Sequence, residues 1–109
     1  TTRTVSCFCG ACTLTVRGPP SHGVSYCHCS ICRRLSGAAF STQALWSASD
    51  VEVKAGQELH RGMHATKNVE RIRCGECGAP VMAKLMKGKV NALPLSLFDR
   101  ELVTTDPAF

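Results

Sequence analysis

The sequence predicts a mainly β domain in which short antiparallel strands are joined by turns that carry cysteines. Three observations predict this fold class. Several short runs alternate apolar and polar residues with the period of a half-buried strand. Gly10, Gly75 and Gly78 stand beside cysteines, as expected for tight turns that need positive φ values. Only residues 30–35 look helical, with Ser30 as a suitable N-cap, and they would make little more than one turn.

The expected strands follow one another along the chain. In residues 11–17 the side chains of Cys12, Leu14 and Val16 share one face, and the Gly- and Pro-rich residues that follow end this strand. Further alternating runs predict strands at residues 50–54, 68–73, 81–86 and 89–97. The last two runs flank Lys87-Gly88 and should form a hairpin. Pro94 indicates that the final run is an edge strand or contains a bulge.

The size of the chain, 109 residues with 44% hydrophobic content, fits a single domain over residues 1–109 with a modest core. No apolar run approaches the roughly 20 residues of a membrane span, and the N-terminus does not resemble a signal peptide. We therefore expect a soluble, cytoplasmic protein with no membrane partner. Because the chain begins at Thr1 rather than Met and ends on TTDPAF, we also expect a trimmed or C-terminally truncated form.

The net charge is +5, from 13 Lys and Arg against eight Asp and Glu. The basic residues are scattered along the sequence, and no ladder of aromatic residues accompanies them, as stacking on single-stranded nucleic acid would need. We interpret the charge as a solvated basic surface and do not expect a nucleic-acid partner.

The eight cysteines divide by spacing into Cys-x-Cys, Cys-x-x-Cys and related groups, namely Cys7 and Cys9, then Cys12, then Cys27, Cys29 and Cys32, then Cys74 and Cys77. Without a signal peptide, such spacing favours metal ligands over disulfides. A redox pair at CGEC (74–77) would stand before a helix, whereas a strand-like run follows here. We therefore interpret these cysteines as zinc ligands.

Two zinc sites per chain account for seven of the cysteines. Two remote pairs, Cys7 with Cys9 and Cys74 with Cys77, would complete a structural site of four thiolates. The remaining three, Cys27, Cys29 and Cys32, leave a fourth position open, which is the pattern of a catalytic zinc.

Several alternatives stay open for the second site. His22, His60, His64 or Cys12 could supply its fourth ligand and make it purely structural. His28 should face away from the metal, because it alternates with Cys27 and Cys29 on an extended segment, and Cys12 is expected to be a buried core thiol. Arg33 and Arg34 are either solvated or bind a carboxylate of the substrate.

Four stretches together resemble a known family: SCFCGACTLTV (6–16), VSYCHCSICRRLSGAAF (24–40), CGECGAPV (74–81) and LSLFD (95–99). In order and spacing, over about residues 5–99, they are similar to the glutathione-dependent formaldehyde-activating enzyme family, which also includes the centromere-protein-V-like proteins. The resemblance implies a zinc-bound β-tent fold with one structural and one catalytic zinc. It implies the same division of the seven cysteines between the two sites.

The sequence departs from the family pattern near the second Cys-x-x-Cys, where Arg73 and Gly75 stand in place of a common aromatic residue and a common proline. In LSLFD, Ser96 stands where glycine is common. None of these residues is a predicted ligand, but we expect them to alter the substrate pocket.

The predicted function is that of a zinc-dependent carbon-sulfur lyase. A zinc already bound by three thiolates is a weak Lewis acid and suits a soft thiol such as glutathione, whose sulfur would add to a small carbonyl such as formaldehyde. Breakdown of the adduct S-hydroxymethylglutathione is the reverse reaction. His28, His60 and His64 are candidate general acids. The alternative is a zinc-stapled binding module without catalysis, for a protein or nucleic-acid partner.

Overall fold

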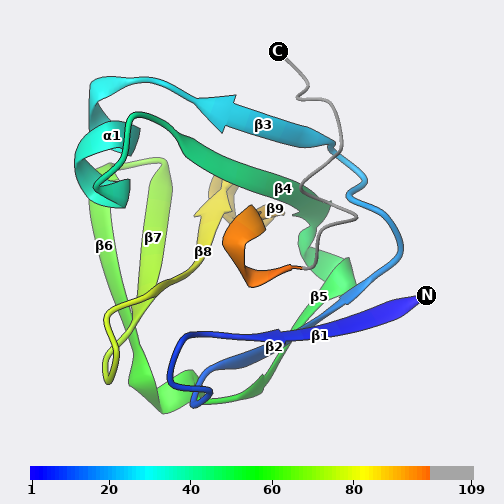
Figure 1. Cartoon of the computed structure of the whole chain (residues 1–109). Helices are drawn as coiled ribbons and strands as arrows, with labels where there is room; N and C mark the ends of the chain where they lie inside the picture. The colour runs from blue at the N-terminus through cyan, green and yellow to red at the C-terminus, as the bar shows by residue number, and fades with distance from the viewer. Residues whose placement is uncertain (99–109) are drawn as a thin grey trace.

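The structure is a computed structural model that describes residues 1–98, and it contains two antiparallel sheets and one short helix (Figure 1). Asp99, the last residue of the LSLFD motif, and the C-terminal TTDPAF lie outside the described residues. The elements in chain order are β1 (Thr2–Ser6), β2 (Thr13–Arg17), β3 (Val24–Cys27), α1 (Ser30–Ser36), β4 (Ser41–Ser47), η1 (Ala48–Asp50), β5 (Val51–Ala55), η2 (Gln57–Leu59), β6 (His60–Thr66), β7 (Val69–Cys74), β8 (Pro80–Leu85), η3 (Met86–Gly88), β9 (Val90–Pro94) and η4 (Leu95–Leu97).

The strands form a three-stranded sheet in the order β1-β2-β5 and a six-stranded sheet in the order β3-β4-β9-β8-β7-β6. The mainly β fold class and the antiparallel pairing are therefore confirmed. The predicted hairpin at Lys87-Gly88 is also confirmed, because β8 and β9 pair antiparallel from Leu85 and Val90 outward.

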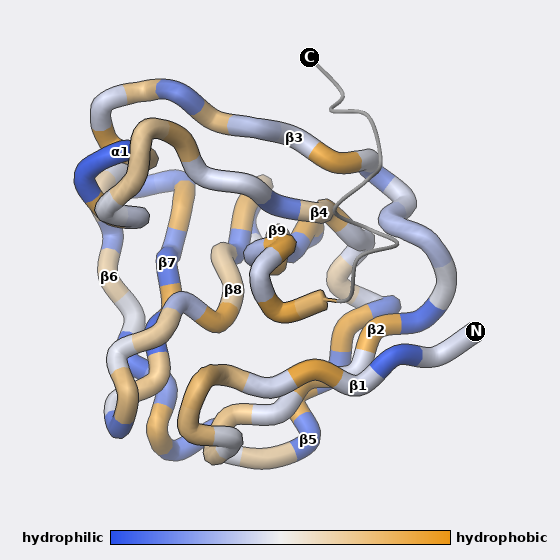
Figure 2. Tube along the Cα trace, viewed as in Figure 1, coloured by the Kyte–Doolittle hydropathy of each residue, from blue (hydrophilic) through white to orange (hydrophobic). Residues whose placement is uncertain are grey.

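The hydrophobic core lies between the two sheets. Leu14 and Val16 of β2 contribute from one side, while Trp46 of β4 and Leu93 of β9 contribute from the other, and all four are almost completely buried. Figure 2 shows hydrophobic segments on β1, β2 and β9 that belong to this core. The indole Nε1 of Trp46 donates a hydrogen bond to the carbonyl of Gly18 at 3.1 Å, which satisfies its one polar group.

Two local predictions were wrong. Cys29, not Ser30, is the N-cap of α1, and its sulfur accepts a hydrogen bond from the backbone N–H of Cys32. Pro94 is not on an edge strand, because β9 lies between β4 and β8. Proline is tolerated there because it is the last residue of β9 and lies beyond Ala92, where the ladder with β8 ends.

The strands β1, β3, β4 and β6 were not predicted. For β6 the reason is that it is the edge of the six-stranded sheet and most of its side chains are exposed, so it lacks the alternation of apolar residues. No helix within residues 1–98 is long and apolar enough to cross a bilayer.

Candidate functional site

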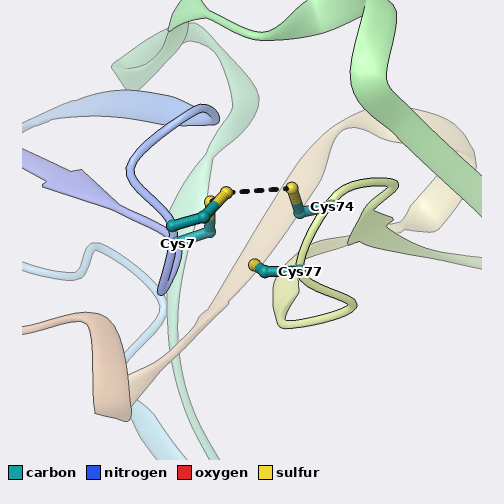
Figure 3. A group of neighbouring side chains, drawn as sticks. Cys7, Cys74 and Cys77 are labelled. Atoms are coloured by element: carbon teal, nitrogen blue, oxygen red, sulfur yellow. Dashed lines mark hydrogen bonds between the residues drawn. The ribbon is translucent and has the colours of Figure 1, made fainter.

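Four cysteines meet where the β1–β2 loop approaches the β7–β8 loop (Figure 3). We call them the four-cysteine cluster: Cys7, Cys9, Cys74 and Cys77. Their sulfur atoms all lie within 4.8 Å of one another. The Sγ atoms of Cys7 and Cys9 are 3.6 Å apart, and those of Cys9 and Cys74 are 3.8 Å apart. The cluster joins the small sheet to the large one.

Backbone amides support negative charge on this cluster. The N–H of Cys12 donates to Sγ of Cys7 at 3.4 Å, and the N–H of Glu76 donates to Sγ of Cys74 at 3.4 Å. Burial opposes ionisation of Cys7, but the Cys12 N–H and the neighbouring thiols outweigh it and lower the pKa of Cys7 to about 6. The pKa of Cys74 is also lowered, chiefly by the hydrogen bond from the backbone of Cys77. Part of the cluster is thus arranged to carry thiolates.

The second group, the three-cysteine cluster, is formed by Cys27 at the end of β3, Cys29 as the N-cap of α1 and Cys32 in its first turn. Sγ of Cys27 and Sγ of Cys29 are 3.5 Å apart. The hydrogen bond from the Cys32 N–H is the main reason that the pKa of Cys29 falls to about 7. The hydrogen bond to the Cys32 thiol is the main reason that the pKa of Cys27 rises to about 11.

Within residues 1–98, no fourth Cys, His, Asp or Glu side chain joins the three-cysteine cluster. Cys12 is fully buried in the core, as predicted, and its thiol donates to the carbonyl of Gly56 at 3.7 Å. The other residues predicted as alternative ligands lie elsewhere: Nε2 of His22 is 3.3 Å from Oγ of Ser47, His60 pairs with Cys74 across β6 and β7, and His64 is exposed on β6.

A cavity of about 410 Å³ adjoins the three-cysteine cluster, and Cys32 forms part of its wall. The wall also contains Phe40, Met63 and Met82, together with polar residues of β4. None of the four histidines lines the cavity, although the ring of His28 packs 5.0 Å from the ring of Phe40. The cavity therefore offers space for a small molecule next to one of the cysteines.

Three arginines line this cavity: Arg61, Arg71 and Arg73. Of these, only Arg73 was expected from the sequence to affect the substrate pocket. The exposed Arg33 and Arg34, which were predicted to bind a carboxylate, are not among the lining residues. Their role stays a prediction. Alternate residues of a strand share one face, so the sequence of β7 could have indicated that Arg71 and Arg73 lie on the same face. The polar strand β6 offered no such pattern for Arg61.

The contacts of the three arginines differ. Arg73 donates from Nη1 to the carbonyl of Gly78 at 2.9 Å and from Nη2 to the carbonyl of Leu35, so it links the four-cysteine loop to the end of α1. Nη1 of Arg61 donates to backbone carbonyls of its own strand region. Arg71 approaches the cluster, with Nη2 at 4.0 Å from Sγ of Cys32.

Two of the three departures from the family pattern, Arg73 and Ser96, line the cavity, whereas Gly75 is not among its lining residues. Their place in the fold fits the expectation that these two residues change the shape and charge of the pocket.

Comparisons with known proteins agree with this description. The sequence matches the family model of the glutathione-dependent formaldehyde-activating enzyme over residues 2–108. The fold is similar to the crystal structure of a Rhodobacter sphaeroides protein, with a TM-score of 0.78 and 19% sequence identity over 96% of this chain and 98% of that one. No curated protein gave a significant match to the sequence.

Proposed function

Since the chain belongs to the glutathione-dependent formaldehyde-activating enzyme family, we propose that it is a zinc-dependent carbon-sulfur lyase acting on thiol adducts of small carbonyls. Membership supports a function related to glutathione and formaldehyde in general. The adduct S-hydroxymethylglutathione is the specific substrate that we propose.

The spacing of the sulfur atoms supports zinc at both clusters. Thiolates bind zinc at about 2.3 Å in a tetrahedron, which puts neighbouring sulfur atoms about 3.8 Å apart. The observed separations of 3.5, 3.6 and 3.8 Å are close to this value. Disulfides, with sulfur atoms at about 2.05 Å, do not fit these distances, and the structure assigns all eight cysteines as free.

One observation carries the proposal: the three-cysteine cluster has no fourth ligand within residues 1–98, and its Cys32 opens onto the cavity. Cys27, Cys29 and Cys32 would hold the catalytic zinc, and the four-cysteine cluster would hold a structural one. A zinc with three thiolate ligands can bind a soft external thiol and favour its ionised form.

The chain's own residues would hold the reactants beside this cluster. The thiol sulfur forms a bond to the carbonyl carbon, and the thiol proton ends on the carbonyl oxygen; the lyase direction breaks the same bond and returns the proton to sulfur. The guanidinium of Arg71 near Sγ of Cys32 offsets thiolate charge at the cluster. Phe40 and Met63 give part of the cavity an apolar surface that limits water around the reacting atoms.

A glutathione titration of the cobalt-substituted protein tests the proposal. Binding of a new thiolate should add saturable sulfur-to-cobalt charge-transfer absorption. A Cys29→Ser variant should lose this response while keeping the ion of the four-cysteine cluster, and a Cys12→Ser variant should keep the response. A spectrum that does not change with both ions bound would contradict the lyase and favour the alternative of a binding module without catalysis.

A further inference from the structure

The wall of the cavity carries positive charge from three arginines, and none of its lining residues among those described carries a carboxylate. Arg61 faces Arg73, and Met63 faces Arg71, across the antiparallel pair of β6 and β7, so the three arginines are close neighbours in one ladder. No Asp or Glu lines the cavity within residues 1–98, and within that range none of the three arginines forms an ion pair. Three guanidinium groups in a concave site attract an anion.

Two polar atoms in the same wall are buried without a hydrogen-bond partner among the described residues. They are Nε of Arg71 and Oγ of Ser41. Leaving such groups unpaired is unfavourable, most of all for a charged group, and a ligand that pairs with them would remove this cost. Both an N–H and a hydroxyl can donate to a carboxylate.

These atoms lie beside the three-cysteine cluster. Ser41 pairs with Cys27 in the β3–β4 ladder, and Nη2 of Arg71 is 4.0 Å from Sγ of Cys32. A ligand held by Ser41 and Arg71 would therefore extend from the cysteines into the cavity.

The cavity is also too large for the smallest carbonyl alone. Formaldehyde is little larger than a water molecule, which occupies about 30 Å³, whereas the cavity measures about 410 Å³. A ligand of several more atoms is needed to fill it.

We propose that this cavity is a carboxylate-binding subsite, in which Arg71 Nε–H and the Ser41 hydroxyl donate to a carboxylate of the ligand. Arg61 and Arg73 supply further positive charge, but their Nη1 groups already donate to backbone carbonyls, so Arg71 is the principal contact. The proposal deepens the proposed function, on which it rests, by requiring an acidic ligand. The carboxylate comes either from the thiol peptide or from a carbonyl compound that is itself an acid.

Calorimetric titration of the metal-loaded full chain separates these sources. The probes are S-methylglutathione, which has both carboxylates but a capped sulfur, its diethyl ester, which has neither carboxylate, and glyoxylate, a small oxo acid. We expect S-methylglutathione to bind at least tenfold more tightly than its diester if the thiol peptide is the source. Saturable binding of glyoxylate with loss of that preference identifies the carbonyl compound as the source.

Arg71→Gln should weaken binding of the preferred acid at least tenfold and remove the difference between acid and ester. Arg71→Lys keeps the charge but loses the Nε–H and should recover only part of the affinity. Ser41→Ala removes only one hydroxyl and should weaken binding about threefold. It provides the test of the subsite if Arg71→Gln does not fold. Lys54→Gln removes one exposed positive charge from the small sheet and should change the affinity less than twofold.

Equal binding of S-methylglutathione and its diester without saturable binding of glyoxylate, unchanged affinity in both Arg71→Gln and Ser41→Ala, or a loss seen instead in Arg34→Gln would overturn the subsite. These results differ from failure of the lyase proposal. If the lyase proposal fails, cobalt spectra do not respond to glutathione, yet S-methylglutathione or glyoxylate still binds in a manner that depends on Arg71. If only the subsite fails, the cobalt response to glutathione persists, and Arg71→Gln binds the acid with the same affinity as the unsubstituted protein.

Discussion

Replacing two cysteines of the four-cysteine cluster should destabilise the fold more than replacing two cysteines of the three-cysteine cluster. The four-cysteine cluster links Cys9 to Cys74, which are 65 positions apart. A cross-link over such a loop lowers the entropy of the unfolded chain by an amount worth about 4 kcal/mol, on the relation used for disulfides. The three-cysteine cluster spans only residues 27–32, and the same relation gives about 2 kcal/mol.

The matched variants are Cys74→Ser/Cys77→Ser and Cys27→Ser/Cys29→Ser. Because small domains have a total stability of about 5–15 kcal/mol, a loss of about 4 kcal/mol should leave the first double variant strongly destabilised. The second should remain folded and be more stable than the first by at least about 2 kcal/mol, or about 8–16 °C in Tm. A Cys12→Ser variant controls for replacing a buried cysteine that belongs to neither cluster.

Urea unfolding followed by tryptophan fluorescence measures these differences. Trp46 is the one tryptophan of the sequence, is fully buried and stacks on Phe98 with ring centroids 5.3 Å apart, so its emission reports loss of the core. Metal content by mass spectrometry should fall by one ion in each double variant. Equal losses of stability, or two ions retained after Cys74→Ser/Cys77→Ser, would refute the reasoning.

Two further predictions concern single residues outside the ligand set. Arg73→Gln should lower the free energy of unfolding by about 2 kcal/mol, because two hydrogen bonds from a charged group to backbone carbonyls are lost, and urea denaturation with unchanged stability would contradict the bridging role. Gly56→Ala should lower the Tm by more than Gly18→Ala, since a Cβ at Gly56 (φ +83°) would lie 2.3 Å from the carbonyl oxygen of Ala11, whereas one at Gly18 (φ +72°) meets nothing within 4 Å. The expected costs are at least about 2 kcal/mol and about 1 kcal/mol, and equal shifts in a thermal melt would count against the close approach of backbone at Gly56.

The grouping of the cysteines could be predicted from sequence because it depends on local geometry. Cys-x-Cys and Cys-x-x-Cys pairs converge on one ion whatever lies between the pairs, so the partners of each cluster followed from counting ligands. Strands such as β2 could be predicted for a similar reason, since Leu14 and Val16 alternate with polar residues and are buried as expected.

Arg61 and Arg71 of the cavity could not be predicted because their position depends on sheet order. Strand β6 is a polar edge strand, so nothing in its sequence indicates that Arg61 faces Arg73. Arg33 and Arg34 follow Cys32 directly in the sequence, and for that reason they were predicted to bind the carboxylate instead. Arg71 is 39 positions from Cys32, yet the pairing of β7 within the sheet and the position of α1 bring its Nη2 to 4.0 Å from the Cys32 sulfur.

The two clusters differ in what a change of ligand would cost the fold, and this difference fits their proposed roles. An ion in the four-cysteine cluster connects two sheets, so any ligand exchange there would loosen the core around Cys7 and Cys74, both of which are buried. The three-cysteine cluster is closed within one strand end and one helical turn, where the Cys32 N–H already supports Cys29. Under the proposed function, exchange of a thiol ligand at this cluster would therefore not require a change in the pairing of either sheet. Arg73 forms hydrogen bonds to both the β7–β8 loop and the end of α1. It therefore attaches the helix of the three-cysteine cluster to a loop of the four-cysteine cluster.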